Sequence, residues 1–483
     1  MRFVSPFRAA LLPLVLMLAC CAGCSTPLAV DDPVKELNTP EQTPRRYMGA
    51  IESLKGRDLT EEERQVLRGM MYRPGYTPEV REAALNLLEQ RDKAGLFETI
   101  GLRLPRLDAL QWRRRLCEII AERGWTDLSQ ALVRAWAIPM PGWVDSETDR
   151  PEYLALARLY GRDRVIDQVF QMLVESNTVA LQGFRRAAWT LLHRLGQRER
   201  LTQLLQSVDE SSQDAMLIDL KAGATELGIV PANYEEILWV RTLRQPAWAT
   251  FWTEAASVIR ALPPASRATI ELRDLPILVA ASKHEPELLT ASRDDLYQRV
   301  DGVLRGRKRH MGGNRPGAYE GYIGTNDQYL NDHRDKLTWG DLAAMLLAMR
   351  ALSVPEVVNH LFDYAERDRA DKSTEYGGLI RLDEKHRFEV IEFIPRVRYH
   401  DNRFESSPAM IEAGYGAVFH FHFHVQRHDN AQYAGPGLGD LDYAQNVRAN
   451  CLVFTSVDRR TMNVDFYRHD RVVVDLGEIK RAD

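Results

Sequence analysis

The stretch Phe419-His420-Phe421-His422-Phe423-His424 alternates aromatic and imidazole side chains. On an extended strand, successive side chains point to opposite faces, so this alternation predicts a β-strand with three histidines on one face. Only twelve histidines occur among the 483 residues, so three in a period-2 row point to metal binding. The alternative is a half-exposed strand whose solvent-facing side happens to carry histidines.

A carboxylate follows sixteen residues after this run, in Gly435-Pro436-Gly437-Leu438-Gly439-Asp440. Glycine and proline predict a break after the strand, with Asp440 at the start of a helix. Two imidazoles and one carboxylate, with a fourth position open to water, form the ligand shell typical of catalytic zinc. Asp440 could instead be an ordinary helix N-cap. The pattern alone leaves open which two of the three histidines bind a metal.

Strand-like and helical segments surround the histidine run in a regular order. We expect strands in segments 373–380, 388–395, 397–399, 451–455, 463–467 and 471–476, and the histidine strand between them. We expect helices in segments 408–415 and 441–449. Strands interleaved with helices are typical of an α/β domain.

The order of these motifs resembles the JAB/MPN (JAMM) metalloprotease family, in particular its prokaryotic branch. The matching residues are Glu375 in Glu-Tyr-Gly-Gly-Leu-Ile, His422 and His424 in the strand, and Asp440 in Pro-Gly-Leu-Gly-Asp-Leu. The resemblance implies a mixed β-sheet over residues 372–483 and a Zn²⁺ held by His422, His424 and Asp440, with His420 as the alternate ligand. It also implies that Glu375 acts as the general base for a zinc-activated water that hydrolyses peptide or isopeptide bonds.

The chain departs from the family pattern around the expected site. Gly437 stands where the family has a serine whose hydroxyl helps to hold the tetrahedral intermediate, and Val425 stands where it has a proline. The loop before Asp440 is also longer. Four residues of this loop are candidates for the missing hydrogen-bond donor: Gln426, His428, Asn430 and Tyr433.

The N-terminus has the pattern of a secretion signal. Arg2 and Arg8 precede an apolar stretch that ends in Cys20-Cys21-Ala22-Gly23-Cys24-Ser25, and this stretch is too short for a spanning helix. Ala-Gly-Cys resembles a bacterial lipoprotein lipobox, which implies a signal peptide over 1–24 and lipidation of Cys24. The expected location is the bacterial cell envelope, lipid-anchored at the outer membrane and facing the periplasm. Four prolines make residues 25–46 an expected tether.

Residues 47–262 have helical apolar spacing throughout. Gly124, Gly161, Gly196 and Gly228 are expected helix ends, at intervals of 37, 35 and 32 residues. Helix pairs at such intervals are typical of an α-solenoid, and the pattern resembles degenerate HEAT-type repeats. The alternative is an irregular helical bundle. Such repeats imply a surface that docks a protein or peptide partner or substrate.

The remaining features bound the function further. Residues 263–371 are expected to form a helical connecting region with an exposed loop over 312–332. The formal net charge of −5 offers no general attraction for nucleic acid. Cys117 and Cys451 are expected to be buried free thiols.

The chain is thus expected to be multidomain, an α-solenoid-like helical region followed by a JAMM-like α/β domain. Two functions fit this organisation. The first is a lipid-anchored zinc metallopeptidase. The second is a non-catalytic envelope lipoprotein scaffold with a metal-binding or inactive JAMM-like domain.

Overall fold

The computed structural model describes residues 30–139, 144–209, 211–310, 328–393, 395 and 404–482. The signal peptide with Cys24, the strand expected at 397–399 and most of the loop expected at 312–332 therefore lie outside the described residues. The contacts within the chain divide it into two compact units. The first runs to Ala135 and includes the segment that ends at Arg162, and the second holds Trp136–Pro139 and everything from Asp163 onward.

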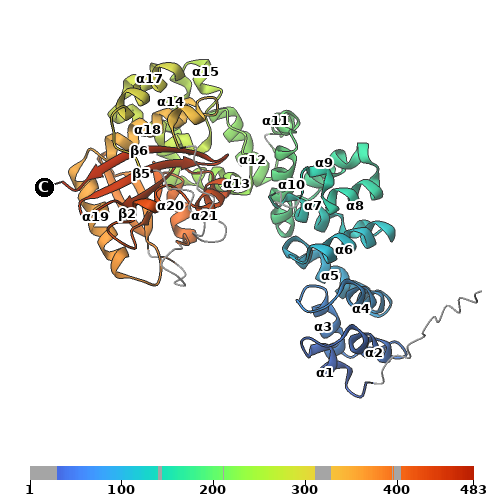
Figure 1. Cartoon of the computed structure of the whole chain (residues 1–483). Helices are drawn as coiled ribbons and strands as arrows, with labels where there is room; N and C mark the ends of the chain where they lie inside the picture. Colours follow the sequence, from blue (N-terminus) through green and yellow to red (C-terminus); the bar gives the residue numbers. More distant parts are fainter. Residues whose placement is uncertain are drawn as a thin grey trace, which may run out of the picture. The chain divides into compact units, whose positions relative to one another are not determined.

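The first unit is built from helices (Figure 1). Its helices are α1 (Pro33–Asn38), α2 (Pro44–Leu54), α3 (Glu61–Met70), α4 (Pro78–Arg91), α5 (Lys93–Arg103), α6 (Leu110–Glu122), α7 (Ser129–Ala137) and α8 (Pro151–Tyr160). The last two residues of α7 belong to the second unit. The capping box expected at Thr60 is confirmed, because its hydroxyl accepts from the Glu63 amide and the Glu63 carboxylate accepts from the Thr60 amide. Apolar residues of α3 (Val66, Leu67 and Met70) and leucines of α4 (Leu85, Leu87 and Leu88) are buried in its core.

The expected tether over 25–46 is wrong for its second half. Pro33 and Pro44 each occupy the first turn of a helix, α1 and α2, and Asp32 caps α1 by accepting from the Lys35 amide. Proline fits this position because the amide it lacks would have no partner there. Leu37 is fully buried, so the chain is already part of the folded unit at α1.

The four glycines expected at helix ends all have left-handed backbone angles, with φ of 63°, 90°, 75° and 71° in chain order. Glycine adopts positive φ without a steric penalty, which is why it terminates helices. Each of the first three is followed by a further helix, as expected: α7, then α9 (Val165–Glu175), then α11 (Arg198–Ser207). The prediction of an all-helical N-terminal region is confirmed.

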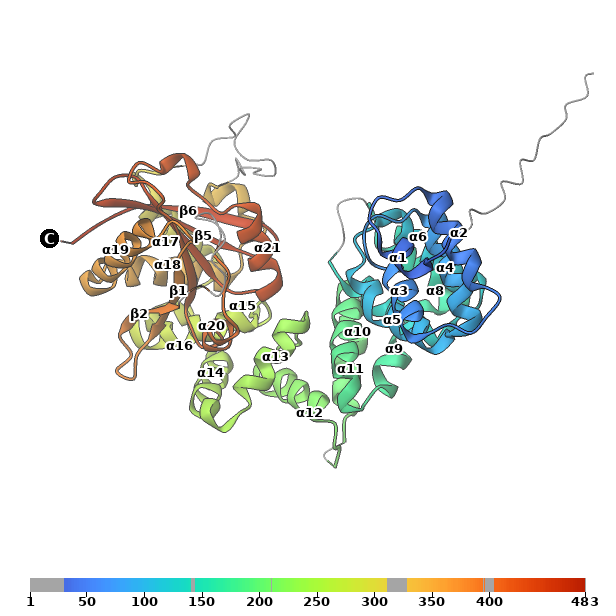
Figure 2. The same ribbon diagram turned by 90° about the horizontal axis from the view of Figure 1, so that it is seen from below.

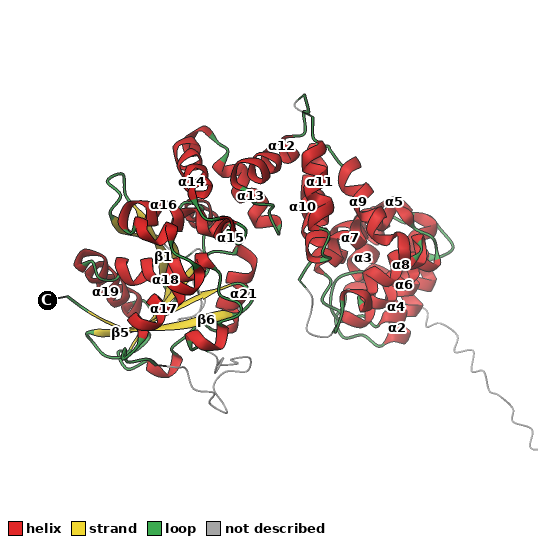
Figure 3. Cartoon of the chain, turned by 90° about the horizontal axis from the view of Figure 1, so that it is seen from above, coloured by secondary structure: helices red, strands yellow, loops and turns green. Residues whose placement is uncertain are grey.

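The second unit combines helices with all the described strands (Figures 2 and 3). Besides α9 and α11, its helices are α10 (Gln182–Arg194), α12 (Ala215–Ala222), α13 (Tyr234–Leu243), α14 (Ala249–Ala261), α15 (Pro264–Arg267), α16 (Leu275–His284), α17 (Arg293–Leu304), α18 (Trp339–Ala351), α19 (Pro355–Ala370), α20 (Pro408–Gly414) and α21 (Leu438–Val447). Its strands are β1 (Gly377–Leu382), β2 (Phe388–Phe393), β3 (Phe419–His424), β4 (Cys451–Ser456), β5 (Thr461–Arg468) and β6 (Val472–Lys480). The expected borders at residues 262 and 371 fall inside this unit.

The six strands form one mixed sheet in the order β2-β1-β3-β4-β5-β6. All neighbours are antiparallel except β3 and β4, which run parallel and are joined through α21. The histidine run is therefore a central strand, and the predicted α/β fold class of the C-terminal part is confirmed. Its alternation also acts as expected: Phe421 and Phe423 lie edge-on against Tyr364 of α19, while the histidines face the side that α20 and α21 cover.

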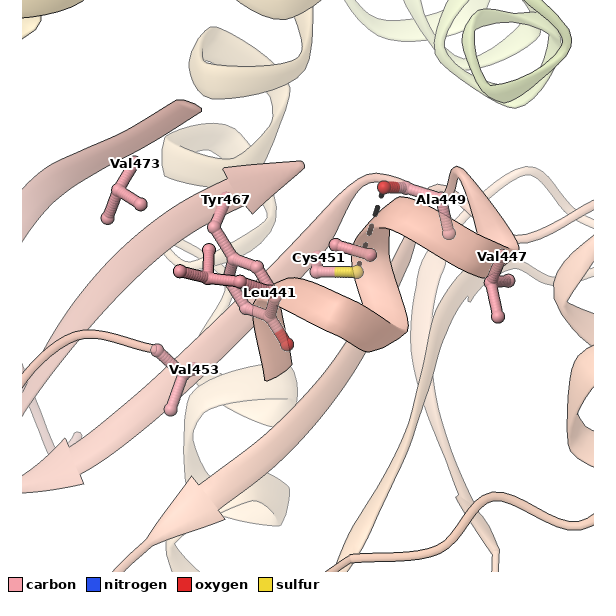
Figure 4. Close-up of a cluster of buried hydrophobic side chains, with 8 residues drawn as sticks. Leu441, Val447, Ala449, Cys451, Val453, Tyr467 and Val473 are labelled. Atoms are coloured by element: carbon pink, nitrogen blue, oxygen red, sulfur yellow. Dashed lines mark hydrogen bonds between the residues drawn. The ribbon is translucent and has the colours of Figure 1, made fainter. Parts of the chain in front are cut away.

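A buried apolar cluster fixes α21 against the sheet (Figure 4). Leu441 and Ala444 of the helix pack with Cys451, Val453 and Tyr467 of the strands. Cys451 is buried and free, as is Cys117, which confirms both expectations. Because the helix cannot roll without opening this cluster, the side chains in its first turn have a set position over β3.

A buried ionic network joins the helices to the sheet. The Arg468 guanidinium of β5 donates two hydrogen bonds of 3.0 Å to the Asp341 carboxylate of α18, and Arg273 donates a third of 2.8 Å. All three side chains are buried. Burial alone would raise the pKa of Asp341, but the two guanidinium charges lower it to about 2. Asp341 therefore stays ionised and ties α18 to the C-terminal strands.

No helix among the described residues combines the length and apolar character that crossing a membrane requires.

Candidate metal centre

The candidate site lies where β3 ends and α21 begins. In a parallel β-α-β unit, the start of the helix returns over the carboxyl end of the first strand, which is the usual place for a ligand site in α/β folds. His422 and His424 point to one face of β3, and their Nε2 atoms lie 3.3 Å apart.

The other ring nitrogen of each histidine has a partner that orients it. His424 Nδ1 lies 3.0 Å from the carbonyl oxygen of Tyr433, and a carbonyl only accepts, so the Nδ1 carries a hydrogen. His422 Nδ1 lies 3.3 Å from the hydroxyl of Tyr467. Bonds of this kind at Nδ1 orient a histidine so that its Nε2 binds a metal.

Asp440 completes the arrangement from the first turn of α21. One carboxylate oxygen, Oδ1, lies 3.2 Å from His422 Nε2, and the other, Oδ2, lies 3.5 Å from His424 Nε2. The helix begins after Gly437, whose amide donates to Asp440 Oδ2 at 2.7 Å. Asp440 is thus not the N-cap residue itself, and its side chain turns inward toward the histidines.

The spacing of these three groups fits a zinc ion. With ligand atoms about 2.0–2.1 Å from a tetrahedral zinc, neighbouring ligand atoms are separated by about 3.3 Å. The separations between the two Nε2 atoms and the carboxylate are 3.2, 3.3 and 3.5 Å. Two imidazoles and one carboxylate leave a fourth tetrahedral position for water or substrate.

Glu375 lies beside this triad and could itself bind a metal together with His422 and His424. One of its carboxylate oxygens is within 4.8 Å of a nitrogen of each histidine. The antiparallel register pairs Gly377 with His422 and continues through a bond from the Phe423 amide to the Tyr376 carbonyl, which brings Glu375 level with His424. Gly377 is needed here, because a Cβ would lie 2.6 Å from the Phe421 carbonyl oxygen.

A polar pair in the loop after β3 holds the Glu375 carboxylate. The Gln426 amide donates to Glu375 Oε1 at 2.9 Å, and Asn430 donates to Gln426 Oε1 at 2.8 Å and to the His424 carbonyl at 3.0 Å. Gln426 and Asn430 are therefore the two of the four loop candidates whose side chains reach the site. Tyr433 contributes its backbone carbonyl only.

The charges in the site shift one another's pKa values. Burial alone would lower the pKa of His424, but its hydrogen bond to Asp440 and the charge of Glu375 outweigh this and raise it to about 9. Burial alone would raise the pKa of Asp440, but the two histidines hold it far below its usual range. Burial, with the charge of Asp440, raises the pKa of Glu375 to about 8. Without metal, the site is a charged hydrogen-bond cluster.

His420, the alternate ligand, lies outside this cluster. Its Nδ1 is 2.8 Å from the Tyr443 hydroxyl, and its Nε2 sits against Gly414 of α20. Burial lowers the pKa of His420 to about 4, so the ring is neutral. The geometry thus groups His422 and His424, the pair at the strand's exit, with Asp440 and Glu375.

Tyr467 is a site residue that the sequence motifs did not indicate, because it comes from β5, two strands away from β3. The register of β3, β4 and β5 places Tyr467 beside His422. This register cannot be read from the spacing of the motifs. No family model, curated protein or solved structure matches this chain.

Proposed function

We propose that this chain is a zinc-dependent metallopeptidase that hydrolyses peptide or isopeptide bonds, similar to the JAMM family. The observation that carries the proposal is the convergence of His422 Nε2, His424 Nε2 and the Asp440 carboxylate, whose two oxygens lie 3.2 and 3.5 Å from these nitrogens. A buried carboxylate, Glu375, lies within 4.8 Å of both imidazoles. This is the combination of three ligands and one adjacent base that metal-assisted hydrolysis requires.

Each residue of the candidate site has a defined role in this proposal. His422, His424 and Asp440 hold the ion, which when bound supplies a Lewis acid for water and for the scissile carbonyl. Glu375 takes the proton of the attacking water and passes it to the leaving amine. Its Oε1 is engaged by Gln426, which leaves Oε2 for the proton. The buried setting raises the basicity of this carboxylate above that of an exposed glutamate.

One observation favours the second candidate, an inactive scaffold. Gly437, in the position of the family's serine, has no side chain that could stabilise an oxyanion. If the chain is a peptidase, a backbone amide of the Gly435–Gly439 segment stabilises the oxyanion instead. The two candidates differ in turnover, and the peptidase alone requires the metal.

The first test is the zinc content of the full-length protein, purified in detergent because of its apolar N-terminal segment and measured by mass spectrometry after dialysis against zinc. We expect about one zinc per chain, and cleavage of a quenched-fluorescence peptide library that a chelator abolishes. A folded protein that takes up no zinc would overturn the peptidase and leave a scaffold without metal. Zinc without cleavage would select the scaffold.

Restoring the family's serine should raise any hydrolysis. Gly437 has φ of −79° and ψ of 179°, an extended conformation that serine adopts freely and that suits a helix N-cap. We expect Gly437→Ser to increase kcat about tenfold, because an added donor reaches the developing oxyanion. Steady-state cleavage of the best library peptide measures this. Gly439→Ser, an exposed position in the same turn where a side chain meets nothing, is the control and should leave kcat unchanged.

Zinc affinity should depend on pH in a defined direction. In the metal-free chain His424 keeps a proton up to its pKa of about 9, and the metal must displace it. The apparent zinc affinity is therefore expected to rise about tenfold per unit from pH 6 to pH 8, as measured by competition with a chelator of known pH dependence.

The same proton has a consequence for the stability of the metal-free chain. The pKa of His424 is raised in the folded chain, so the protonated imidazole stabilises the metal-free fold. This stabilisation is complete below the unfolded pKa of about 6.5 and is lost as the pH rises through 9.

The outcome of the zinc titration that contradicts this prediction is an affinity that stays constant between pH 6 and pH 8. It would show that the metal does not replace the proton of His424.

The helical region and the N-terminal cysteine complete the proposal. We infer that the helices before the sheet dock a protein or peptide, as substrate or partner, and that Cys24 carries the lipid anchor in a bacterial envelope.

A further inference from the structure

Two buried carboxylates lie opposite each other on the last two strands. Asp465 of β5 and Asp475 of β6 are direct cross-strand partners, and neither has exposed surface. Such partners have Cβ atoms about 4.5–5.5 Å apart. Two like charges at this separation, removed from water, repel strongly unless a proton or a cation lies between them.

The hydrogen bonds that these carboxylates accept come from neutral groups. Asp465 Oδ2 accepts from the Gly435 amide at 3.1 Å and from the Asn463 side-chain amide at 3.0 Å. Asp475 accepts from the amides of His310 at 3.0 Å and Gly477 at 2.7 Å. These four bonds bring no positive charge to the pair.

The charges of Arg307, Arg309 and His424 act on the pair, but the hydrogen bonds of the two arginines go elsewhere. Arg307 donates to the Glu478 carbonyl, and Arg309 donates to the Leu304 carbonyl. The charge of Arg309 lowers the pKa of Asp475, but burial is the larger effect and the pKa is raised to about 6. Burial, with the charge of Asp475, also raises the pKa of Asp465. The pair thus lacks a hydrogen-bonded countercharge.

Several buried oxygens around the pair have no hydrogen-bond partner: Asp465 Oδ1, Asn463 Oδ1, Gln328 Oε1 and Thr455 Oγ1. The Asn463 amide is directed at Asp465, and Thr455 is the cross-strand partner of Asn463. The side-chain amide nitrogen of Gln328 lies against Gly435. The backbone carbonyl of Gln328 accepts from the backbone amide of Asp475 at 3.0 Å. A proton shared by the two carboxylates would satisfy one of these acceptors and leave the amide oxygens unpaired.

We propose that Asp465, Asp475, Asn463 and Gln328 bind a divalent cation with a preference for oxygen ligands, Ca²⁺. Calcium accepts carboxylate and amide oxygens together in six- to eight-fold irregular geometry, whereas magnesium retains several waters and zinc prefers nitrogen or sulfur. The ion neutralises the pair and occupies the unpaired oxygens. This inference does not rest on the proposed peptidase activity.

A cation at this place would also hold the loop that leads into α21, whose first turn carries Asp440. Gly435 donates to Asp465 and lies five residues before Asp440 in the sequence. The calcium site therefore anchors the loop that leads to a proposed zinc ligand.

The test is calorimetric titration of the chelator-treated full-length protein with calcium chloride, together with its thermal unfolding. We expect one calcium per chain and an increase of about 5 °C in the unfolding midpoint once calcium exceeds its dissociation constant about a hundredfold. Asp440→Asn, which removes the carboxylate of the other centre, should retain both results. Glu384→Gln, which removes an exposed carboxylate, should retain them too.

Asp465→Asn separates this proposal from a proton-sharing pair. The substitution removes one of the two repelling charges, so the variant should fold without calcium at least as well as the parent, and it should lose the calcium response. A folded parent that does not bind calcium would overturn the proposal, as would an Asp465→Asn variant whose response equals that of the parent.

Discussion

Replacing Asp440 by asparagine is expected to remove most of the zinc that we propose this centre binds. The substitution takes away the charged ligand that lies 3.2 and 3.5 Å from the two Nε2 atoms. Loss of an outer partner of a metal ligand already weakens binding about 10–100-fold, so loss of the ligand itself should weaken it by more than about a hundredfold. Mass spectrometry of dialysed protein measures the change, and His422→Ala should have the same result.

The asparagine variant should remain folded, which makes the measurement decisive. Its side-chain oxygen can still accept from the Gly437 amide that begins α21, and the apolar cluster under the helix is unchanged. Asp442→Asn, an exposed position on the same helix, is the matched control and should keep its zinc. Equal zinc in both variants would place the ion elsewhere.

Replacing Glu375 by glutamine should have the opposite combination of effects. The variant keeps all three ligands, so its zinc content stays at the parent level. Hydrolysis should fall by about 10²–10⁴, the usual contribution of a positioned acid–base group. A quenched-fluorescence peptide that the parent cleaves, used on samples of matched zinc content, measures this loss.

The fold of the glutamine variant is not at risk. The carboxyl group is buried and its pKa is raised to about 8, so a neutral amide of the same shape removes a desolvation cost and can still accept from Gln426. Glu412→Gln, exposed on α20, is the control for handling and charge. Full activity in Glu375→Gln would exclude this residue as the base, even with zinc present.

The parts of the structure that repeat at a fixed period were predictable from the sequence. The alternation of Phe421, His422 and Phe423 defines both faces of β3, and the glycines with positive φ mark helix ends. Residues 263–371 were harder to interpret for a physical reason. Helix α18 is buried around nearly its whole circumference, so it has no polar face and no amphipathic period.

Contacts between distant strands could not be predicted in the same way. Motif spacing indicated Glu375, His422, His424 and Asp440. The hydrogen bonds that orient the two histidine rings, however, depend on where Tyr433 and Tyr467 lie. Those positions follow from strand register and from the path of a loop. The carboxylate pair on β5 and β6 has the same origin, because Asp465 and Asp475 become neighbours only when the two strands pair.

The network around Asp341 has a consequence for the order in which the chain folds during synthesis. Arg273 and Asp341 are made more than a hundred residues before Arg468, which supplies two of the hydrogen bonds that Asp341 accepts. A buried charge without its partner costs about 3–5 kcal/mol. Before Arg468 emerges, Asp341 has Arg273 as a partner but lacks the other two guanidinium hydrogen bonds. We therefore expect the helices up to α19 to complete their core only when the last strands emerge. The first unit, which ends at Arg162, has no such delay, so nascent chains are expected to carry a folded N-terminal part and an open remainder until synthesis ends.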